Sequence, residues 1–257
     1  PGQSVEEVVK RYQDDPNVVY AEPDYVVHTT ATIPNDPFFA SQYDMTAISS
    51  TLAWDTQTNA SDVVVAIVDT GIDFTHPDLQ GNLYTDANGA HGYACFNGSC
   101  VPGGQDDYGH GTHVAGTIGA ATNNGIGVAG INWQVKLLAI KFLDSGGSGN
   151  ISDAVAGFGQ ILALKNAGVN IRVTNNSWGG GGYSQALKDA MTAVEDVGIV
   201  DVCAAGNAGL NADVSPFYPA AFDNRGLISV LASDANDSGA SFTNFGLGNV
   251  DIAAPGV

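Results

Sequence analysis

From residue 62 onward, short apolar runs alternate along the chain with segments in which apolar side chains recur at helical spacing. The run at 63–68 is apolar without interruption, which is typical of a strand buried on both faces of a sheet. Later segments alternate as helix 110–121, strand 137–142, helix 152–166, strand 171–174, helix 184–196 and strand 199–204, with further candidate strands at 227–231 and 250–253. This alternation predicts an α/β fold: a doubly wound parallel sheet, joined by right-handed crossovers and flanked by helices.

The beginning of the chain has a different pattern. Residues 5–12 place apolar side chains on one helical face, and the segments 18–20 and 25–27 read as extended. Residues 29–34 are small and polar, which is typical of a linker. We therefore expect two parts, a short N-terminal segment of residues 1–30 and a larger domain of residues 31–257.

Polar residues that directly follow the apolar runs are the candidates for chemistry, because ligands of such sheets bind outside the carboxyl ends of the strands. Asp69 ends the first run, His110 opens a predicted helix, and Asn207 follows the run at 199–204. A neutral histidine can act as a general base, and an amide can donate to developing negative charge. A capping aspartate and a turn asparagine are the plainer explanations. Zinc is disfavoured, because His113 follows His110 by three residues and no glutamate separates them.

The chain is strongly acidic, with 27 acidic and 8 basic residues and a formal net charge of -19. Nucleic acid and anionic membrane surfaces are disfavoured as partners, since both require a basic face. No apolar run approaches the roughly 18 residues that a spanning helix needs. A solvated acidic surface and an adaptation to salt or calcium both remain open as explanations of the charge.

Three cysteines are present. Cys95 and Cys100 flank the short segment 96–99, and we expect them to form a disulfide worth about 2 kcal/mol. Two free surface thiols are the alternative. Cys203 lies in an apolar run and is expected to be a small buried side chain.

Five motifs, in this order, resemble the subtilase family of subtilisin-like serine proteases. They are A-I-V-D-T-G-I-D at 66–73, H-G-T-H-V-A-G-T at 110–117, N-N-S-W-G at 175–179, A-A-G-N at 204–207 and A-A-P-G-V at 253–257. The resemblance covers residues 34–257 and implies the three-layer fold of that family. It also implies that Asp69 orients His110, that His110 is the general base and then acid, and that Asn207 is the oxyanion donor. His113 would then be a packing residue.

The resemblance also implies where a polypeptide substrate binds. Ser177, Trp178 and Gly179 would pair with an extended peptide by strand addition. Ala204, Ala205 and Gly206 would wall the primary specificity pocket. A broad apolar preference follows as an expectation, and Trp178 either narrows a neighbouring subsite or belongs to the core.

The family's nucleophilic serine lies in a G-T-S-x-A motif beyond A-A-P-G-V, and this sequence ends at Val257. Ser99, Ser177 and Ser241 lack that context. We expect the chain to be part of a longer endopeptidase and to be inactive by itself, because an acyl-enzyme cannot form without the nucleophile. The alternatives are a non-catalytic peptide-binding protein and a doubly wound hydrolase with another nucleophile.

Structural calcium is the implied ion, by similarity to thermitase-like members of the family. The expected ligands are the side chains of Asp36, Asp78 and Asn124 and the carbonyls of Ala121, Ile126 and Val128. Oxygen ligands from several loops suit this ion, although Asn-Gly and Asp-Pro also form turns without metal. Asp106 and Asp107 are the candidates for a weaker second site.

Residues 1–30 resemble the end of a subtilase propeptide, with 17–23 as the matching segment. The resemblance implies a propeptide that assists folding, inhibits the enzyme and is cut off near residues 29–33. An ordinary N-terminal extension is the alternative. A secreted, monomeric protein is expected.

Overall fold

The computed structural model describes residues 4–25, 31–180 and 182–257. The chain divides into two compact units, Pro1–Ala31 and Thr32–Val257. The division falls next to the expected boundary between residues 1–30 and 31–257. Each unit is described by itself below.

The N-terminal unit contains one helix, α1 (Val5–Gln13), among its described residues. Its start is fixed by a capping box, in which the Ser4 hydroxyl accepts from the Glu7 backbone and the Glu7 carboxylate accepts from the Ser4 backbone. No residue of α1 is buried. The helix expected at 5–12 is confirmed, whereas 18–20 forms no strand and residues 26 and 27 lie outside the described part.

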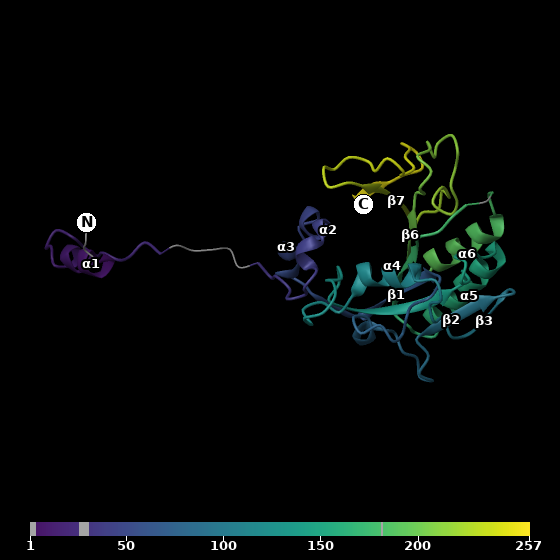
Figure 1. The fold of residues 1–257 in the computed structure, drawn as a ribbon, viewed down its shortest axis with the longest axis horizontal. Helices are drawn as coiled ribbons and strands as arrows, with labels where there is room; N and C mark the ends of the chain where they lie inside the picture. Colours follow the sequence, from purple (N-terminus) through teal and green to yellow (C-terminus); the bar gives the residue numbers. More distant parts are fainter. Residues whose placement is uncertain (1–3, 26–30, 181) are drawn as a thin grey trace. The chain divides into compact units, whose positions relative to one another are not determined.

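The larger unit is built on one sheet (Figure 1), whose described strands have the order β3-β2-β4-β1-β5-β6-β7-β8. Among the strands of the described residues, β2 and β3 pair antiparallel and the other neighbours pair parallel. The strands are β1 (Asn59–Asp69), β2 (Gly92–Phe96), β3 (Ser99–Pro102), β4 (Gln134–Lys141), β5 (Ile171–Asn176), β6 (Val200–Ala204), β7 (Leu227–Ser233) and β8 (Ile252–Pro255). Because β4 and β5 lie on opposite sides of β1, the carboxyl end of β1 is a topological switch point, where α/β sheets place their ligands.

Helices cover both faces of this sheet. The larger unit contains the helices α2 (Tyr43–Ala47), α3 (Ser50–Trp54), α4 (His110–Gly119), α5 (Ile151–Asn166) and α6 (Gln185–Glu195), and the short 3-10 helices η1 (Phe39–Ser41) and η2 (Gln80–Asn82). Alternate side chains of β1 point to opposite faces: Ala66 packs with α5 and α6, and Ile67 packs with α4. The predicted three-layer α/β fold is confirmed.

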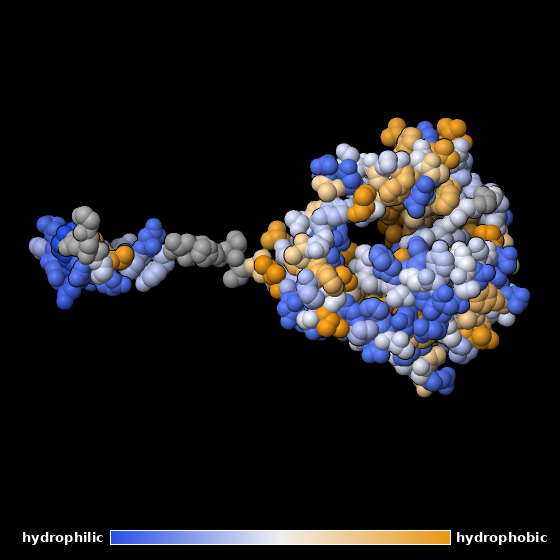
Figure 2. Space-filling view, viewed as in Figure 1, coloured by the Kyte–Doolittle hydropathy of each residue, from blue (hydrophilic) through white to orange (hydrophobic). Residues whose placement is uncertain are grey.

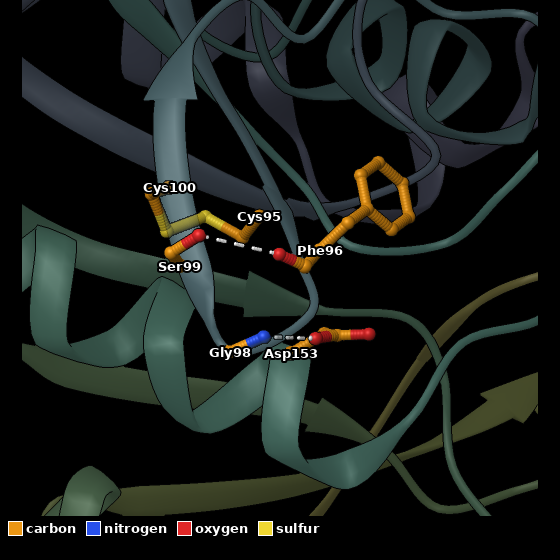
Figure 3. The surroundings of a disulfide bond; sticks show 6 residues. All are labelled: Cys95, Phe96, Gly98, Ser99, Cys100 and Asp153. Atoms are coloured by element: carbon orange, nitrogen blue, oxygen red, sulfur yellow. Dashed lines mark hydrogen bonds between the residues drawn. A yellow bond between two sulfur atoms is a disulfide. The ribbon is translucent and has the colours of Figure 1, made fainter.

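The edge hairpin of β2 and β3 was not predicted from the sequence. Its two-residue turn, Asn97 and Gly98, has positive φ at both positions, the geometry that favours an Asn-Gly pair. Cys95 and Cys100 lie directly opposite each other in the hairpin and are joined by a disulfide (Figure 3). The Gly98 backbone donates to the Asp153 carboxylate at the start of α5, at 2.8 Å, so the hairpin is fixed to this helix.

No helix in the described part of the chain is long and apolar enough to cross a membrane.

Candidate active site

Asp69 and His110 form a hydrogen-bonded pair at the carboxyl end of β1. The Asp69 carboxylate is completely buried, and its Oδ1 lies 2.7 Å from Nδ1 of His110 and 2.7 Å from the backbone nitrogen of Thr70, which donates to it. With Nδ1–H directed at Asp69, the atom of His110 that can take up a proton is Nε2. The structure therefore brings together the two residues expected to share a proton.

The helix start approaches the strand end closely enough to hold this pair. His110 is the first residue of α4, and the Gly111 backbone donates to the Thr70 hydroxyl at 2.9 Å. A Cβ on Gly111 would lie 2.2 Å from the carbonyl oxygen of Gly71. Only glycine fits at this position, which explains its place directly after the histidine.

Asp106 caps the helix that carries His110. Its Oδ1 accepts from the Tyr108 and Gly109 backbones at 3.0 and 2.9 Å, and its Oδ2 accepts from the backbone and hydroxyl of Thr112. Burial opposes ionisation of Asp106, but these hydrogen bonds outweigh it and lower the pKa to about 2. The carboxylate of Asp106 is thus committed to the helix cap, and the suggested second calcium site at Asp106 and Asp107 has no support.

The pKa of His110 is raised above its ordinary value. The hydrogen bond to Asp69 is the largest cause; burial opposes it, and the charges of Asp69 and Asp106 add to it. A histidine with two carboxylates behind it is a stronger base, which suits a residue that must accept a proton from a weakly acidic hydroxyl.

Lys141 braces the same region from inside the protein. Its ammonium donates to the carbonyls of Thr70 at 2.8 Å and Leu143 at 2.6 Å and to the carboxylate of Asp107 at 2.6 Å, while the residue is only 6% exposed. One buried side chain therefore ties the end of β4 to the residue after Asp69 and to the loop that leads into His110.

A cavity of about 460 Å³ lies beside His110. Ser177, Trp178 and Gly179, the expected substrate-binding residues after β5, line it together with His110. The Trp178 ring packs edge-on against Phe142 with centroids 4.7 Å apart, so this tryptophan belongs both to the cavity wall and to the core. The cavity thus borders both the histidine and the segment that follows β5.

Asn207 lies on the loop after β6, as expected from its place behind the apolar run. Ala205 and Gly206 are buried, whereas Asn207 is exposed. In the described part of the chain no hydrogen bond joins Asn207 to Asp69 or His110, and neither it nor Ala204, Ala205 or Gly206 lines the cavity beside His110. The structure thus assembles the acid–base pair and leaves Asn207 on a separate loop.

The expectation that His113 is a packing residue is wrong. The buried residues of α4 are Gly111, Ala115 and Gly119, which share one face of the helix. His113 is exposed and lies on the wall of a second cavity of about 780 Å³, away from that face.

The expected calcium ligands converge near the start of the larger unit. Asp36 and Asp78, 4% and 3% exposed, both reach the loop 121–128. The Asn123 backbone donates to Asp36 at 2.7 Å, and the Asn124 side chain and the Val128 backbone donate to Asp78 at 2.8 and 3.1 Å. The second carboxylate oxygen of Asp36, Oδ1, is buried without a partner in the described residues.

The expected set of carboxylate, amide and carbonyl oxygens is of the kind that a hard cation takes, and an orphaned buried carboxylate oxygen is costly unless something binds it. The Asn124 side chain directs its Nδ2 at Asp78, however, and its Oδ1 accepts from the Ile126 backbone at 2.9 Å. No group of three or more His, Cys, Asp or Glu side chains that could hold a metal occurs among the described residues. Any ion at this site would therefore depend on backbone carbonyls as well as on its two carboxylates.

A buried carboxylate bonded to Nδ1 of a histidine, at the switch point of a doubly wound sheet, defines the acid–base half of a serine-hydrolase site. Residues 60–257 match the model of the subtilase family (Peptidase_S8), and the chain belongs to this family.

Named relatives agree with this assignment. The chain is 38% identical over 255 residues to the "Thermophilic serine proteinase" of Bacillus sp. strain AK1, covering 99% of this chain and 59% of the relative. It is 39% identical over 224 residues to thermitase of Thermoactinomyces vulgaris, covering 87% of this chain and 73% of thermitase. A solved structure of proteases from Pseudoalteromonas arctica superposes with a TM-score of 0.73 at 30% identity, over 88% of this chain and 73% of that one. The chain thus spans less than two thirds of the first of these relatives.

Sequence reasoning missed two supports of the pair, Lys141 and the role of Asp106 at the start of α4. Asp106 gives no ordinary capping signal, because the N-cap residue of α4 is Gly109, three residues further on. Lys141 carries no local signal for its contacts with Thr70 and Asp107, which lie 71 and 34 positions away along the sequence.

Proposed function

We propose that the protein containing this chain is a serine endopeptidase that cleaves extended polypeptides through an acyl-enzyme. The observation that carries the proposal is the 2.7 Å contact between the buried Asp69 carboxylate and Nδ1 of His110. No described serine is hydrogen-bonded to His110. We therefore expect the nucleophile in sequence outside residues 1–257, in line with the share of its relatives that the chain covers.

In the proposed reaction, Nε2 of His110 takes the proton of the serine hydroxyl as its oxygen attacks the substrate carbonyl. Asp69 stabilises the imidazolium that forms. The Asn207 side chain donates to the oxyanion, and His110 then passes the proton to the leaving amine, which breaks the peptide bond. A water molecule attacks the acyl-enzyme with His110 again as base, which releases the acid and the free serine. Residues 177–179 hold the peptide by backbone pairing, and Ala204, Ala205 and Gly206 face its side chain.

The test measures casein hydrolysis by the full-length protein with and without a serine-directed fluorophosphonate. We expect hydrolysis that the inhibitor abolishes. Asp69→Ala should lower kcat by about 10⁴-fold, the size established for a triad aspartate in subtilisin itself. Asp73→Ala is the matched control, because Asp73 lies in the same loop and bonds Thr75 and Gln105 rather than His110. Binding of casein without hydrolysis would instead support the non-catalytic peptide-binding alternative.

We also propose a structural calcium ion held by the carboxylates of Asp36 and Asp78, the Asn124 side chain and the carbonyls of Ala121, Ile126 and Val128. Bound there, calcium would neutralise two buried carboxylates and tie the segment around residue 36 to the loop 121–128. The melting temperature in calcium and in EDTA tests this. EDTA should destabilise the wild type, and Asp36→Asn should remove most of that dependence. Asp237→Asn, which deletes one exposed charge, should retain it.

We further propose that residues 1–30 are the C-terminal part of an inhibitory propeptide, that the protein is secreted and that it acts as a monomer. The division of the chain into the units Pro1–Ala31 and Thr32–Val257 supports a removable segment, and the Cys95–Cys100 disulfide suits an oxidising compartment. N-terminal sequencing of the mature protein should place the cut near residues 29–33. A mature protein that still begins within residues 1–28 would contradict it.

A further inference from the structure

The loop that carries Asn207 is held by one buried side chain from a distant part of the sequence. Asn244, only 1% exposed, donates from Nδ2 to the Ala205 carbonyl at 2.9 Å. Its Oδ1 accepts from the backbones of Ala208 and Leu210, both at 3.1 Å. Its own backbone nitrogen donates to the Gly206 carbonyl at 2.8 Å. These contacts lie on both sides of Asn207.

The contacts require an amide at this position. One end of the Asn244 side chain must donate to a carbonyl, and the other must accept from two N–H groups. A carboxylate would place an acceptor, and a buried charge, against the Ala205 carbonyl. Alanine would leave one carbonyl and two N–H groups without partners.

Gly206 makes room for this arrangement. Its φ of +104° lies in the region that favours glycine, and a Cβ there would lie 2.4 Å from Nδ2 of Asn244. The glycine of A-A-G-N therefore matches the buried amide as well as the turn that leads into Asn207.

Asn207 itself has no hydrogen-bond partner among the described residues, and its side chain is exposed. Its position is therefore set by the backbone of residues 205–210, which Asn244 fixes. We propose that Asn244 is the positioning residue that holds Asn207 in place as oxyanion donor, an inference that rests on the function proposed above for Asn207. The amide of Asn244 does not touch the substrate and acts through the loop alone.

The expected signature is a loss in kcat with little change in KM. An oxyanion donor acts in the transition state, and a misplacement of about 1 Å can cost about 10²-fold in rate. Asn244→Ala in the full-length enzyme should lower kcat by about 10- to 100-fold, whereas KM should change by less than about 2-fold. Asn249→Ala is the matched control, because Asn249 holds the neighbouring residues Ala212 and Asp213 rather than the Asn207 loop. It should leave kcat unchanged.

A double-mutant cycle separates positioning from general stability. Asn244→Ala is compared in the wild-type and Asn207→Ala backgrounds, with kcat normalised to the folded fraction seen by near-UV circular dichroism. We expect the loss from Asn244→Ala to shrink to less than about 3-fold once Asn207 is absent. Should that variant fold poorly, Asn244→Ser enters the same cycle, because its shorter hydroxyl side chain cannot make all three amide contacts and introduces no buried charge.

Two results would overturn the inference in different ways. If Asn207→Ala lowers kcat and Asn244→Ala costs the same factor in both backgrounds, Asn244 is structural only. If Asn207→Ala leaves kcat unchanged, the oxyanion role fails and this proposal fails with it. Activity of the Asp69–His110 pair towards casein is measured separately and decides the protease assignment.

Discussion

The two halves of the sheet, the first with β1 and β4 and the second with β6 and β7, hold their functional residues by different means. β1 and β4 are buried on both faces near their carboxyl ends, between the α4 layer and the α5 and α6 layer. β6 alternates between buried and less buried residues, β7 buries only Ser229 and Ser233, and Ile228 of β7 and Ile252 of β8 remain 37% and 53% exposed. Figure 2 shows hydrophobic side chains at the surface near β7 and the C-terminal segment; the large exposed ones of residues 208–247 are Leu210, Val214, Ile228, Phe242, Phe245 and Leu247.

This difference matters for the site. Asp69 ends β1, whose apolar packing on two sides fixes the backbone, and His110 opens α4, which packs against β1. The loop after β6 depends instead on buried polar contacts, above all those of Asn244. Substitution of buried polar side chains should therefore lower stability or activity most in the half of the sheet that contains β6 and β7.

The largest expected effect concerns Asp201, a completely buried carboxylate on β6. Thr174 donates to its Oδ1, and Oδ2 has no partner among the described residues. Burial raises the pKa of Asp201 to about 7 against the Thr174 hydrogen bond, and the charge of Glu195 raises it further. Between pH 3.8 and about 7, the folded state therefore keeps a proton on Asp201 that the unfolded chain, with the ordinary pKa of 3.8, releases.

The sign of the pH dependence follows from that difference. The contribution of Asp201 to the free energy of unfolding is complete below the unfolded-state pKa and is lost as the pH rises to about 7. The free energy of unfolding should fall by roughly 4 kcal/mol between pH 4 and 8 for this reason. Asp201→Asn should remove this loss, so its stability relative to wild type should grow with pH in urea unfolding. Asp189→Asn, on the exposed face of α6, is the control and should show no such trend. A constant difference between Asp201→Asn and wild type across this range would refute the prediction.

The same contrast explains what the sequence could and could not predict. The uninterrupted run at 63–68 identified a strand buried on both faces, and the motifs around Asp69 and His110 identified the pair that the structure brings together. The Asn97–Gly98 hairpin was overlooked although its signal is local. The exposure of His113 could not be inferred, because it depends on which face of α4 packs against the sheet.

The bracing side chains were beyond sequence reasoning for a physical reason. Lys141 meets Thr70 across 71 positions of the chain, and Asn244 meets Ala205 across 39. A lysine in an apolar strand and an asparagine in a loop have many possible partners. Only the folded backbone shows which carbonyls they satisfy.

The next largest effect is expected at Lys141. Lys141→Met should lower the free energy of unfolding by about 2–3 kcal/mol, because the carbonyls of Thr70 and Leu143 lose their buried donor. The ion pair with Asp107 adds little, since that carboxylate is 51% exposed. Lys136→Met on the same strand is the control: its ammonium makes one 3.4 Å contact, with the Gly81 carbonyl. Equal stability losses in the two variants, measured in urea, would show that the bracing contacts are unimportant.

A smaller effect is expected from the disulfide at the edge of the first half. Cys95 and Cys100 are five residues apart, so their link should add about 2 kcal/mol by restricting the unfolded chain. Dithiothreitol should lower the melting temperature of the wild type and leave the double variant Cys95→Ala, Cys100→Ala unaffected. Cys203→Ala should keep the sensitivity, because Cys203 is a free buried thiol. If dithiothreitol no longer lowers the melting temperature of Cys203→Ala, the effect comes from Cys203 and not from the disulfide, and the prediction is wrong.

The smallest expected effect is electrostatic and lies within the acid–base pair. The charge of Asp106 is a minor cause of the raised pKa of His110, behind the hydrogen bond to Asp69. Asp106→Asn keeps a carbonyl oxygen for the helix cap and removes the charge, so the pKa of His110 should fall. NMR titration of the imidazole C–H signals of His110, whose chemical shifts change with protonation, would measure the fall in pKa. The acid limb of the pH–activity profile of the full-length enzyme should move to lower pH, because His110 stays neutral at lower pH. Asp107→Asn removes the same charge one residue along, where the carboxylate faces Lys141, and should shift His110 less. A His110 pKa that rises in Asp106→Asn would mean that the cap, rather than its charge, sets the basicity of the pair.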